Sequence, residues 1–197
     1  IIAGGIKGFE TKQEKLPNSY LPTNIGCFRN CTALKEVIIP EGVTSINKNT
    51  FEGCSSLVNV YLPQSLITID SNAFFRTGIE NIDIPENVEN INMQCFSNCQ
   101  SLKSVNIENP DTIINDRAFN YCINLVDINL PQNLTRINNN VFSYCESLEN
   151  ITIPSSVTEI GQYAFANCTK LDIAIPDTVT SIDSSAFEEV KHITYNG

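Results

Sequence analysis

A segment of 23 residues recurs along most of the chain, and this repetition limits the possible folds more than any other feature. The clearest copy starts at Leu148 and reads LENITIPSSVTEIGQYAFANCTK. Its leading Leu or Ile recurs at intervals of 23, 22, 23, 23, 23 and 23 residues, at Leu34, Leu57, Ile79, Leu102, Leu125, Leu148 and Leu171. Self-similarity at this period is typical of a solenoid, in which each repeat buries its apolar side against its neighbours.

Each repeat begins with a short run of alternating apolar residues, such as Val37 and Ile39 or Ile151 and Ile153. This period-2 pattern predicts one half-buried β-strand per repeat. Most runs end at a proline, which lacks the N–H that a sheet needs: Pro40, Pro63, Pro85, Pro131, Pro154 and Pro176. About seventeen residues then lead to the next strand, enough for a crossover, so we expect parallel strands.

The return path between strands has two fixed positions. The first holds only Asn, Asp or Gly, which favours a tight corner with positive φ: Asn47, Asp70, Asn92, Asn115, Asn138, Gly161 and Asp183. The second holds phenylalanine in every copy: Phe51, Phe74, Phe96, Phe119, Phe142, Phe165 and Phe187. We expect these rings to stack in one internal column, where each buries about 150 to 250 Å².

Together these landmarks give the frame L-x-x-I-x-I-P-x-x-V-x-x-I-x-x-x-A-F-x-x-C over about Leu34 to Val190, which resembles the treponemal or BspA-like class of leucine-rich repeats. The resemblance implies a right-handed repeat solenoid with a parallel β-sheet on the concave side and short turns or helical segments on the convex side. It also implies a cell-surface or secreted protein of a bacterium or parasitic protist. Such a protein would adhere to host or extracellular-matrix proteins or to other cells.

The repeat divides the chain without a linker. Residues 1–33 are predicted to be a degenerate N-terminal cap, in which Leu16-Pro17, Phe28 and Cys31 still keep the repeat phase. Residues 34–192 hold seven repeats, and residues 193–197 begin a truncated final strand. Because the chain starts with Ile1 and has no secretory signal, we expect an excised or processed fragment whose natural protein continues beyond Gly197.

The net charge of the chain limits the classes of partner that it is expected to bind. Its formal net charge is −10, which suits neither nucleic acid nor an anionic membrane surface, since both require a basic face. No stretch approaches the apolar length of a membrane span, so we expect no membrane insertion. The charge instead favours a protein or glycoprotein ligand with basic patches, such as an extracellular-matrix or host-surface protein.

Six of the eight cysteines share one repeat position: Cys31, Cys54, Cys99, Cys122, Cys145 and Cys168. Thr77 and Val190 occupy the same position, which predicts a small buried slot filled by free thiols. Disulfide bonds Cys27–Cys31 or Cys95–Cys99 remain the alternative. Neither of these pairs has CxxC spacing, and no His lies nearby as a partner, so no metal and no cofactor are predicted.

An enzyme is not expected. The single histidine, His192, stands in the last strand with no nucleophile beside it in the repeat pattern. Asp111 and Asp116 are close in sequence, but acids on the return path of a solenoid are usually solvated. No catalytic residue is therefore predicted.

Binding is favoured because stacked strands build an extended face. The outward residues form two rows, rich in acids and amides and carrying one apolar pair. The predicted ligand-binding residues are Glu36, Ile38, Asn59, Tyr61, Asn81, Asp83, Asn106, Asp127, Asn129, Asn150 and Thr152. The alternatives are that these are ordinary solvated residues and that the array is a structural spacer or stalk presenting another domain.

Two departures from the repeat stand out. Glu108-Asn109-Pro110-Asp111 replaces the usual Ile-Pro pattern, and the repeat that contains Thr77-Gly78 is one residue short. Each is expected to kink the solenoid, to present a loop, or to be a tolerated irregularity of the surface. Asn150 also lies in one of four glycosylation sequons, with Asn30, Asn133 and Asn167, and a glycan there would oppose binding on this face.

Overall fold

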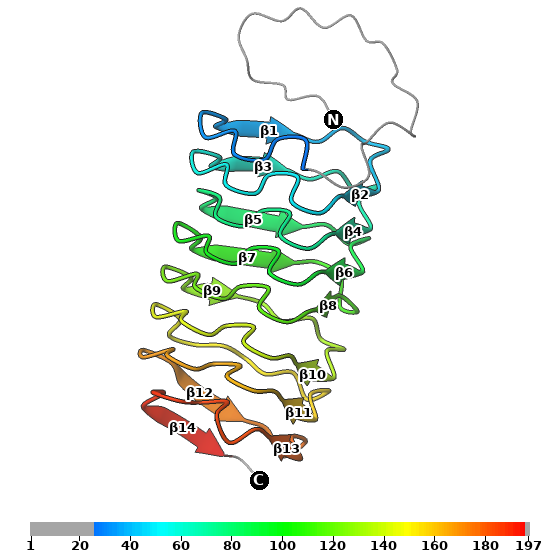
Figure 1. The fold of residues 1–197 in the computed structure, drawn as a ribbon. Helices are drawn as coiled ribbons and strands as arrows, with labels where there is room; N and C mark the ends of the chain where they lie inside the picture. Colours follow the sequence, from blue (N-terminus) through cyan, green and yellow to red (C-terminus); the bar gives the residue numbers. More distant parts are fainter. Residues whose placement is uncertain (1–25, 196–197) are drawn as a thin grey trace, which may run out of the picture.

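The computed structural model describes residues 26–195, which wind into a stack of similar coils (Figure 1). One side of each coil contributes a strand to the long-strand sheet. Its members are β1 (Glu36–Ile38), β3 (Asn59–Tyr61), β5 (Asn81–Ile84), β7 (Ser104–Ile107), β9 (Asp127–Ile128), β12 (Asp172–Ile175) and β14 (His192–Tyr195). Neighbouring strands pair in parallel, as predicted, in the groups β1-β3, β5-β7-β9 and β12-β14. A bridge between Asn150 and Asp172 continues the sheet towards β12.

Each coil also supplies a second, shorter strand, so the prediction of one strand per repeat was wrong. These strands form the short-strand sheet: β2 (Ser45–Ile46), β4 (Thr68–Ile69), β6 (Asn90–Ile91), β8 (Ile113–Ile114), β10 (Arg136–Ile137), β11 (Glu159–Ile160) and β13 (Ser181–Ile182). They pair in parallel as β2-β4-β6-β8 and β10-β11-β13. A two-residue strand is too short to show a period-2 pattern, which is why the sequence did not reveal it.

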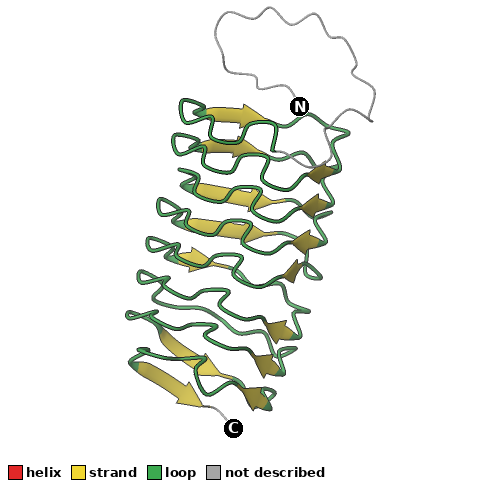
Figure 2. Cartoon of the chain, in the orientation of Figure 1, coloured by secondary structure: helices red, strands yellow, loops and turns green. Residues whose placement is uncertain are grey.

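The rest of each coil consists of turns, and no helix occurs in residues 26–195 (Figure 2). Helical segments, one of the two expectations for the return path, are therefore absent from this part of the chain. The backbone amides of Asn49, Phe51 and Gly53 donate to carbonyls of the next coil at 2.8 to 3.1 Å. The amides between them donate three residues back within their own coil. Every second amide thus links neighbouring coils, which satisfies the backbone without a helix.

The corner with positive φ is not where the sequence placed it. None of the seven Asn, Asp or Gly positions has positive φ. Left-handed residues instead lie two positions before and two after each of the six inner phenylalanines of the column, such as Asn49 (φ 59°) and Gly53 (φ 74°) around Phe51. The predicted corner residues instead form hydrogen bonds. The Asn138 side-chain amide donates to the Ile114 carbonyl at 2.7 Å, and the Asp70 carboxylate accepts from the Ser71 amide at 2.6 Å. Where the position holds Asn or Asp, the side-chain polar group rather than backbone freedom explains the residue type.

The predicted column of phenylalanine rings is confirmed. Neighbouring rings stack with centroids 5.3 to 5.8 Å apart, from Phe28 to Phe187. The six inner rings are fully buried, whereas Phe28 and Phe187 are half-buried. No single coil encloses its own ring, so each depends on the coils above and below.

A second internal column consists of thiols. In Cys54, Cys99, Cys122, Cys145 and Cys168 the Sγ atom donates to the carbonyl of the phenylalanine one coil earlier, at 2.9 to 3.3 Å. All five are buried, as predicted. Cys31, which was predicted to be buried with them, is exposed instead. Of the residues predicted to form the N-terminal cap, Leu16 and Pro17 lie outside the described part of the chain.

Candidate functional site

The predicted binding residues lie on the outward face of the long-strand sheet, between the buried residues of the same strands. Strand register sets Glu36 beside Asn59 and Ile38 beside Tyr61. It likewise sets Asn81 beside Ser104 and Asp83 beside Asn106. The register therefore places these residues in two parallel rows, on strands that follow one another along the stack (Figure 1).

An apolar pair stands out on this face. Ile38 is 48% exposed and Tyr61 is 54% exposed, although each neighbours the other across β1 and β3. Exposed apolar side chains are common on protein surfaces, but tyrosine with an adjacent aliphatic group is also typical of interface cores.

Two of the predicted polar residues are engaged within the fold. The Asn129 side chain accepts from the Ile107 amide at 2.7 Å and donates to the Ile107 carbonyl at 2.8 Å. It therefore extends the sheet beyond β9 and is less available to a ligand. Asn81 accepts a hydrogen bond from the Ser104 hydroxyl at 2.7 Å.

The fixed charges of the outward face, within the described strands, are all negative. Glu36, Asp83 and Asp127 were predicted, and Asp172 in β12 joins them next to Asn150. Sequence reasoning missed Asp172 because it aligned the last repeat on Leu171. The usable signal was the spacing from Pro154 to Pro176, which is one residue shorter than the repeat and shifts the register of this strand.

A depression of about 260 Å³ opens where β3 is not hydrogen-bonded to β5. Its lining includes the predicted residues Asn59, Tyr61, Asn81 and Asp83, and also Glu108, which the sequence did not single out as a binding residue. Glu108 takes the position that proline occupies in the neighbouring repeats. That departure from the repeat was the signal that could have identified it.

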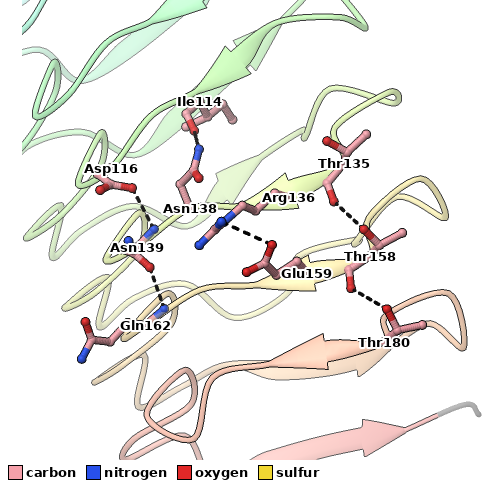
Figure 3. A network of polar contacts seen from close by, with 10 residues as sticks. All are labelled: Ile114, Asp116, Thr135, Arg136, Asn138, Asn139, Thr158, Glu159, Gln162 and Thr180. Atoms are coloured by element: carbon pink, nitrogen blue, oxygen red, sulfur yellow. Dashed lines mark hydrogen bonds and ion pairs between the residues drawn. The ribbon is translucent and has the colours of Figure 1, made fainter.

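On the short-strand side, several polar groups around β10, β11 and β13 bond to neighbouring coils (Figure 3). The Thr158 hydroxyl donates to the Thr135 carbonyl at 3.3 Å, and the Thr180 hydroxyl donates to the Thr158 carbonyl at 3.4 Å. Arg136 and Glu159 form an ion pair with Nη1 and Oε2 3.3 Å apart. These side chains join neighbouring coils and stabilise the stack.

The acids considered for catalysis also have structural partners. Asp111 accepts from the Asn133 side-chain amide at 2.7 Å, and Asp116 accepts from the Asn139 backbone amide at 3.0 Å. His192 is exposed in β14. Across the described coils, no group of three or more His, Cys, Asp or Glu side chains is placed to hold a metal ion. The same coils contain no helix with the length and apolarity needed to span a bilayer.

The cysteines are free thiols in the structure, including both members of the pairs considered for disulfide bonds. Burial raises the pKa of Cys54 and Cys99 to about 11 and that of Cys168 to about 12. These thiols remain protonated at neutral pH and are poor nucleophiles. Cys27 and Cys31 are exposed.

Comparison with known proteins agrees with the architecture. The pattern described as BspA type leucine rich repeat region matches residues 23–148 and 112–196, in six copies. A leucine-rich repeat protein from Bacteroides ovatus is 31% identical with a TM-score of 0.76, over 85% of this chain and 47% of that protein. The leucine-rich repeat protein of T. pallidum is 26% identical with a TM-score of 0.70, over 75% of this chain and 70% of that one.

A third solved structure, from Eubacterium ventriosum, is 27% identical with a TM-score of 0.69 and covers 79% of this chain and 43% of its own. This chain spans about half the length of the Bacteroides protein, as the coverage of 47% shows. Comparison with curated protein sequences gives no match. The matched repeats extend over most of the sequence, so the chain belongs to the BspA-type leucine-rich-repeat family.

Proposed function

We propose that this chain is a non-catalytic binding module of a cell-surface or secreted protein. It mediates adhesion to host or extracellular-matrix proteins, or to other cells, through the outward face of the long-strand sheet. The observation that carries the proposal is the outward face of the long-strand sheet, which sets the exposed apolar pair Ile38 and Tyr61 on the same face as the carboxylates of Glu36, Asp83 and Asp127. The family resemblance supports the surface location.

The proposed contact residues are those that the sequence identified, with Ile38 and Tyr61 as the apolar centre. The structure changes this set in two ways. Asp172 joins the acidic residues, and Asn129 contributes less because its side chain is already hydrogen-bonded to the backbone of Ile107. A partner with basic patches fits this face, because its fixed charges are negative.

The test is a pull-down from serum, extracellular-matrix and cell-surface extracts with the full chain. An Ile38→Ser, Tyr61→Ala variant is expected to lose a partner that the parent retains. The matched control is Ile67→Ser, Ile113→Ser, because these residues are also exposed apolar side chains, at 40% and 50%, but flank or belong to the short-strand sheet. The control is expected to retain the partner.

Equal retention by both variants would contradict binding through the long-strand sheet. If the parent chain retains no partner in the pull-down, the result favours the alternative, a structural spacer or stalk that presents another domain. The continuous column of stacked rings suits that alternative too, since it joins each described coil to the next.

A further inference from the structure

The depression beside Tyr61 combines a cavity, an aromatic ring and two carboxylates. It has a volume of about 260 Å³ and lies between β3 and β5, where the long-strand sheet is interrupted. Tyr61 and Leu62 supply its apolar wall, and Asp83 and Glu108 supply its negative charge. Its lining contains no Lys, Arg or His, so no cationic residue of the lining neutralises these carboxylates.

Both departures from the repeat fall around this depression. Glu108 follows β7 at a position where neighbouring repeats have proline, and it occupies the register position beside Pro85 of the preceding coil. The shortened repeat, which contains Gly78, forms the connection from β3 to β5. A regular array would offer the same surface on every coil, whereas these two changes alter the repeats on either side of the one that contains β5.

The apolar wall and the two carboxylates determine which chemical group fits the depression. Glu108 and Asp83 have the same strand parity, so both project from the outward face. A guanidinium group is planar and forms bidentate bonds with carboxylates, and it also stacks on aromatic rings. Arginine therefore matches the two carboxylates and Tyr61 at once, which the compact, strongly hydrated ammonium group of lysine does less well.

We propose that this depression binds an arginine side chain of a partner protein, with an apolar residue of the partner next to it. The guanidinium lies between Asp83 and Glu108 and stacks on Tyr61. The adjacent apolar residue contacts Ile38, which neighbours Tyr61 in β1 and is 48% exposed. The inference rests on the proposed function, because it names the anchor of a partner on the same face.

The experiment titrates the full chain with N-acetyl-Leu-Arg-Leu-amide and follows backbone amide signals by NMR. A peptide with citrulline in place of arginine is the matched control, since citrulline keeps the shape but lacks the charge. We expect the signals of Tyr61, Asn81, Asp83 and Glu108 to shift at millimolar arginine peptide and not with the citrulline peptide. Added salt should reduce the affinity, because the depression is open to solvent.

Variants of equal charge then locate the site. Asp83→Asn, Glu108→Gln is expected to bind the arginine peptide about tenfold more weakly, because two charge contacts are lost. Asp127→Asn, Asp172→Asn removes the same charge from the same face outside the depression, and we expect a change of less than about twofold. Circular dichroism checks that each variant keeps the fold of the parent.

Three results would overturn the inference: no shift at these amides with millimolar arginine peptide, equal binding of the citrulline peptide, or equal weakening by both pairs of variants. The pull-down separates this failure from failure of the proposed function. If Ile38→Ser, Tyr61→Ala loses a partner while the arginine peptide does not bind, the face binds without the arginine contact. If that variant retains every partner of the parent, binding by this face is wrong whatever the peptide does.

Discussion

At the scale of single residues, the phenylalanine column has the largest energetic effect. Phe119 lies between Phe96 and Phe142, with ring centroids 5.5 and 5.8 Å away, and it has no exposed surface. Removal of its ring leaves a cavity that fixed neighbours on both sides cannot fill. The cost therefore includes lost contacts as well as lost burial.

We expect Phe119→Ala to lower the free energy of unfolding by about 3 to 5 kcal/mol, measured by urea denaturation. Phe75→Ala is the control, since Phe75 is only half-buried and is outside the column. The control should cost about 1 kcal/mol. A loss below about 1 kcal/mol for Phe119→Ala would contradict the role of the column.

The thiol column predicts a pH dependence of stability. Burial raises the pKa of Cys99 from its ordinary 9.0 to about 11, so the unfolded chain releases this proton at lower pH than the folded chain does. The contribution to stability is present below pH 9 and is lost as the pH rises towards 11. Urea midpoints under reducing conditions at about pH 7.5 and about pH 10.5 measure the loss.

Cys99→Thr is the control for that loss, because Thr77 occupies the same repeat position naturally and threonine does not ionise in this range. The parent should lose more stability between the two pH values than the variant does. An equal loss would mean that the ionisation of Cys99 does not cause the alkaline destabilisation.

Sequence reasoning worked at core positions and failed at the corners for a physical reason. Burial acts on side-chain type, so the recurrence of Phe and Cys identified both columns. A left-handed backbone was expected from Asn, Asp and Gly, but Arg117 and Tyr163 adopt it here, with φ of 59° and 52°. The hydrogen bonds between coils impose that geometry on whichever residue occupies the position.

At the scale of elements, the shortened repeat shows how a connection fits its neighbour. A Cβ atom on Gly78 would lie 2.4 Å from the carbonyl oxygen of Ser55 in the preceding coil. Backbone cannot yield as a flexible side chain does, so the coils would have to separate. Gly78 thus permits the close approach that a connection with one residue fewer requires.

Gly78→Ala should lower the free energy of unfolding by about 1 to 3 kcal/mol through this overlap. Ser101→Ala is the matched control, because Ser101 stands at the same position in the next repeat and is exposed. It should change stability by less than about 0.5 kcal/mol. Similar losses in thermal melts of the two variants would show that the approach at Gly78 is not limiting.

The sequence was sufficient to predict the outward face of the long-strand sheet, but not the depression on that face. Alternation along each strand was sufficient to select outward residues, because strand parity fixes the side from which they project. The depression was not predictable in this way, since it depends on a missing strand pairing between β3 and β5. Such an interruption results from neighbouring coils together and leaves no pattern within one repeat.

At the scale of the whole molecule, stability is a sum over coils and their contacts. Deletion of residues 126–148 removes one complete period and joins Leu125 to Glu149, which follow each other in repeat phase. We expect this shorter chain to fold with a similar circular dichroism spectrum and to unfold cooperatively at a lower urea midpoint.

Deletion of residues 126–137 is the contrasting variant, because it joins Leu125 to Asn138 and removes only half a coil. Both columns are then out of phase on the two sides of the junction. This variant should lose cooperative unfolding. If both deletions behaved alike, the repeat phase would not control assembly of the stack.

The hydrogen bonds between coils also determine how the molecule responds to force. They run along the stack in both sheets and in the turns, so a pull on the two ends loads the outermost coil before the inner ones. We expect the chain to unwind coil by coil, each step releasing about 75 Å of extended polypeptide. Single-molecule pulling should record this as a series of similar steps, whereas one abrupt rupture would contradict it. A protein tethered at a surface under flow would then lengthen under tension instead of detaching, and would rewind when the tension falls.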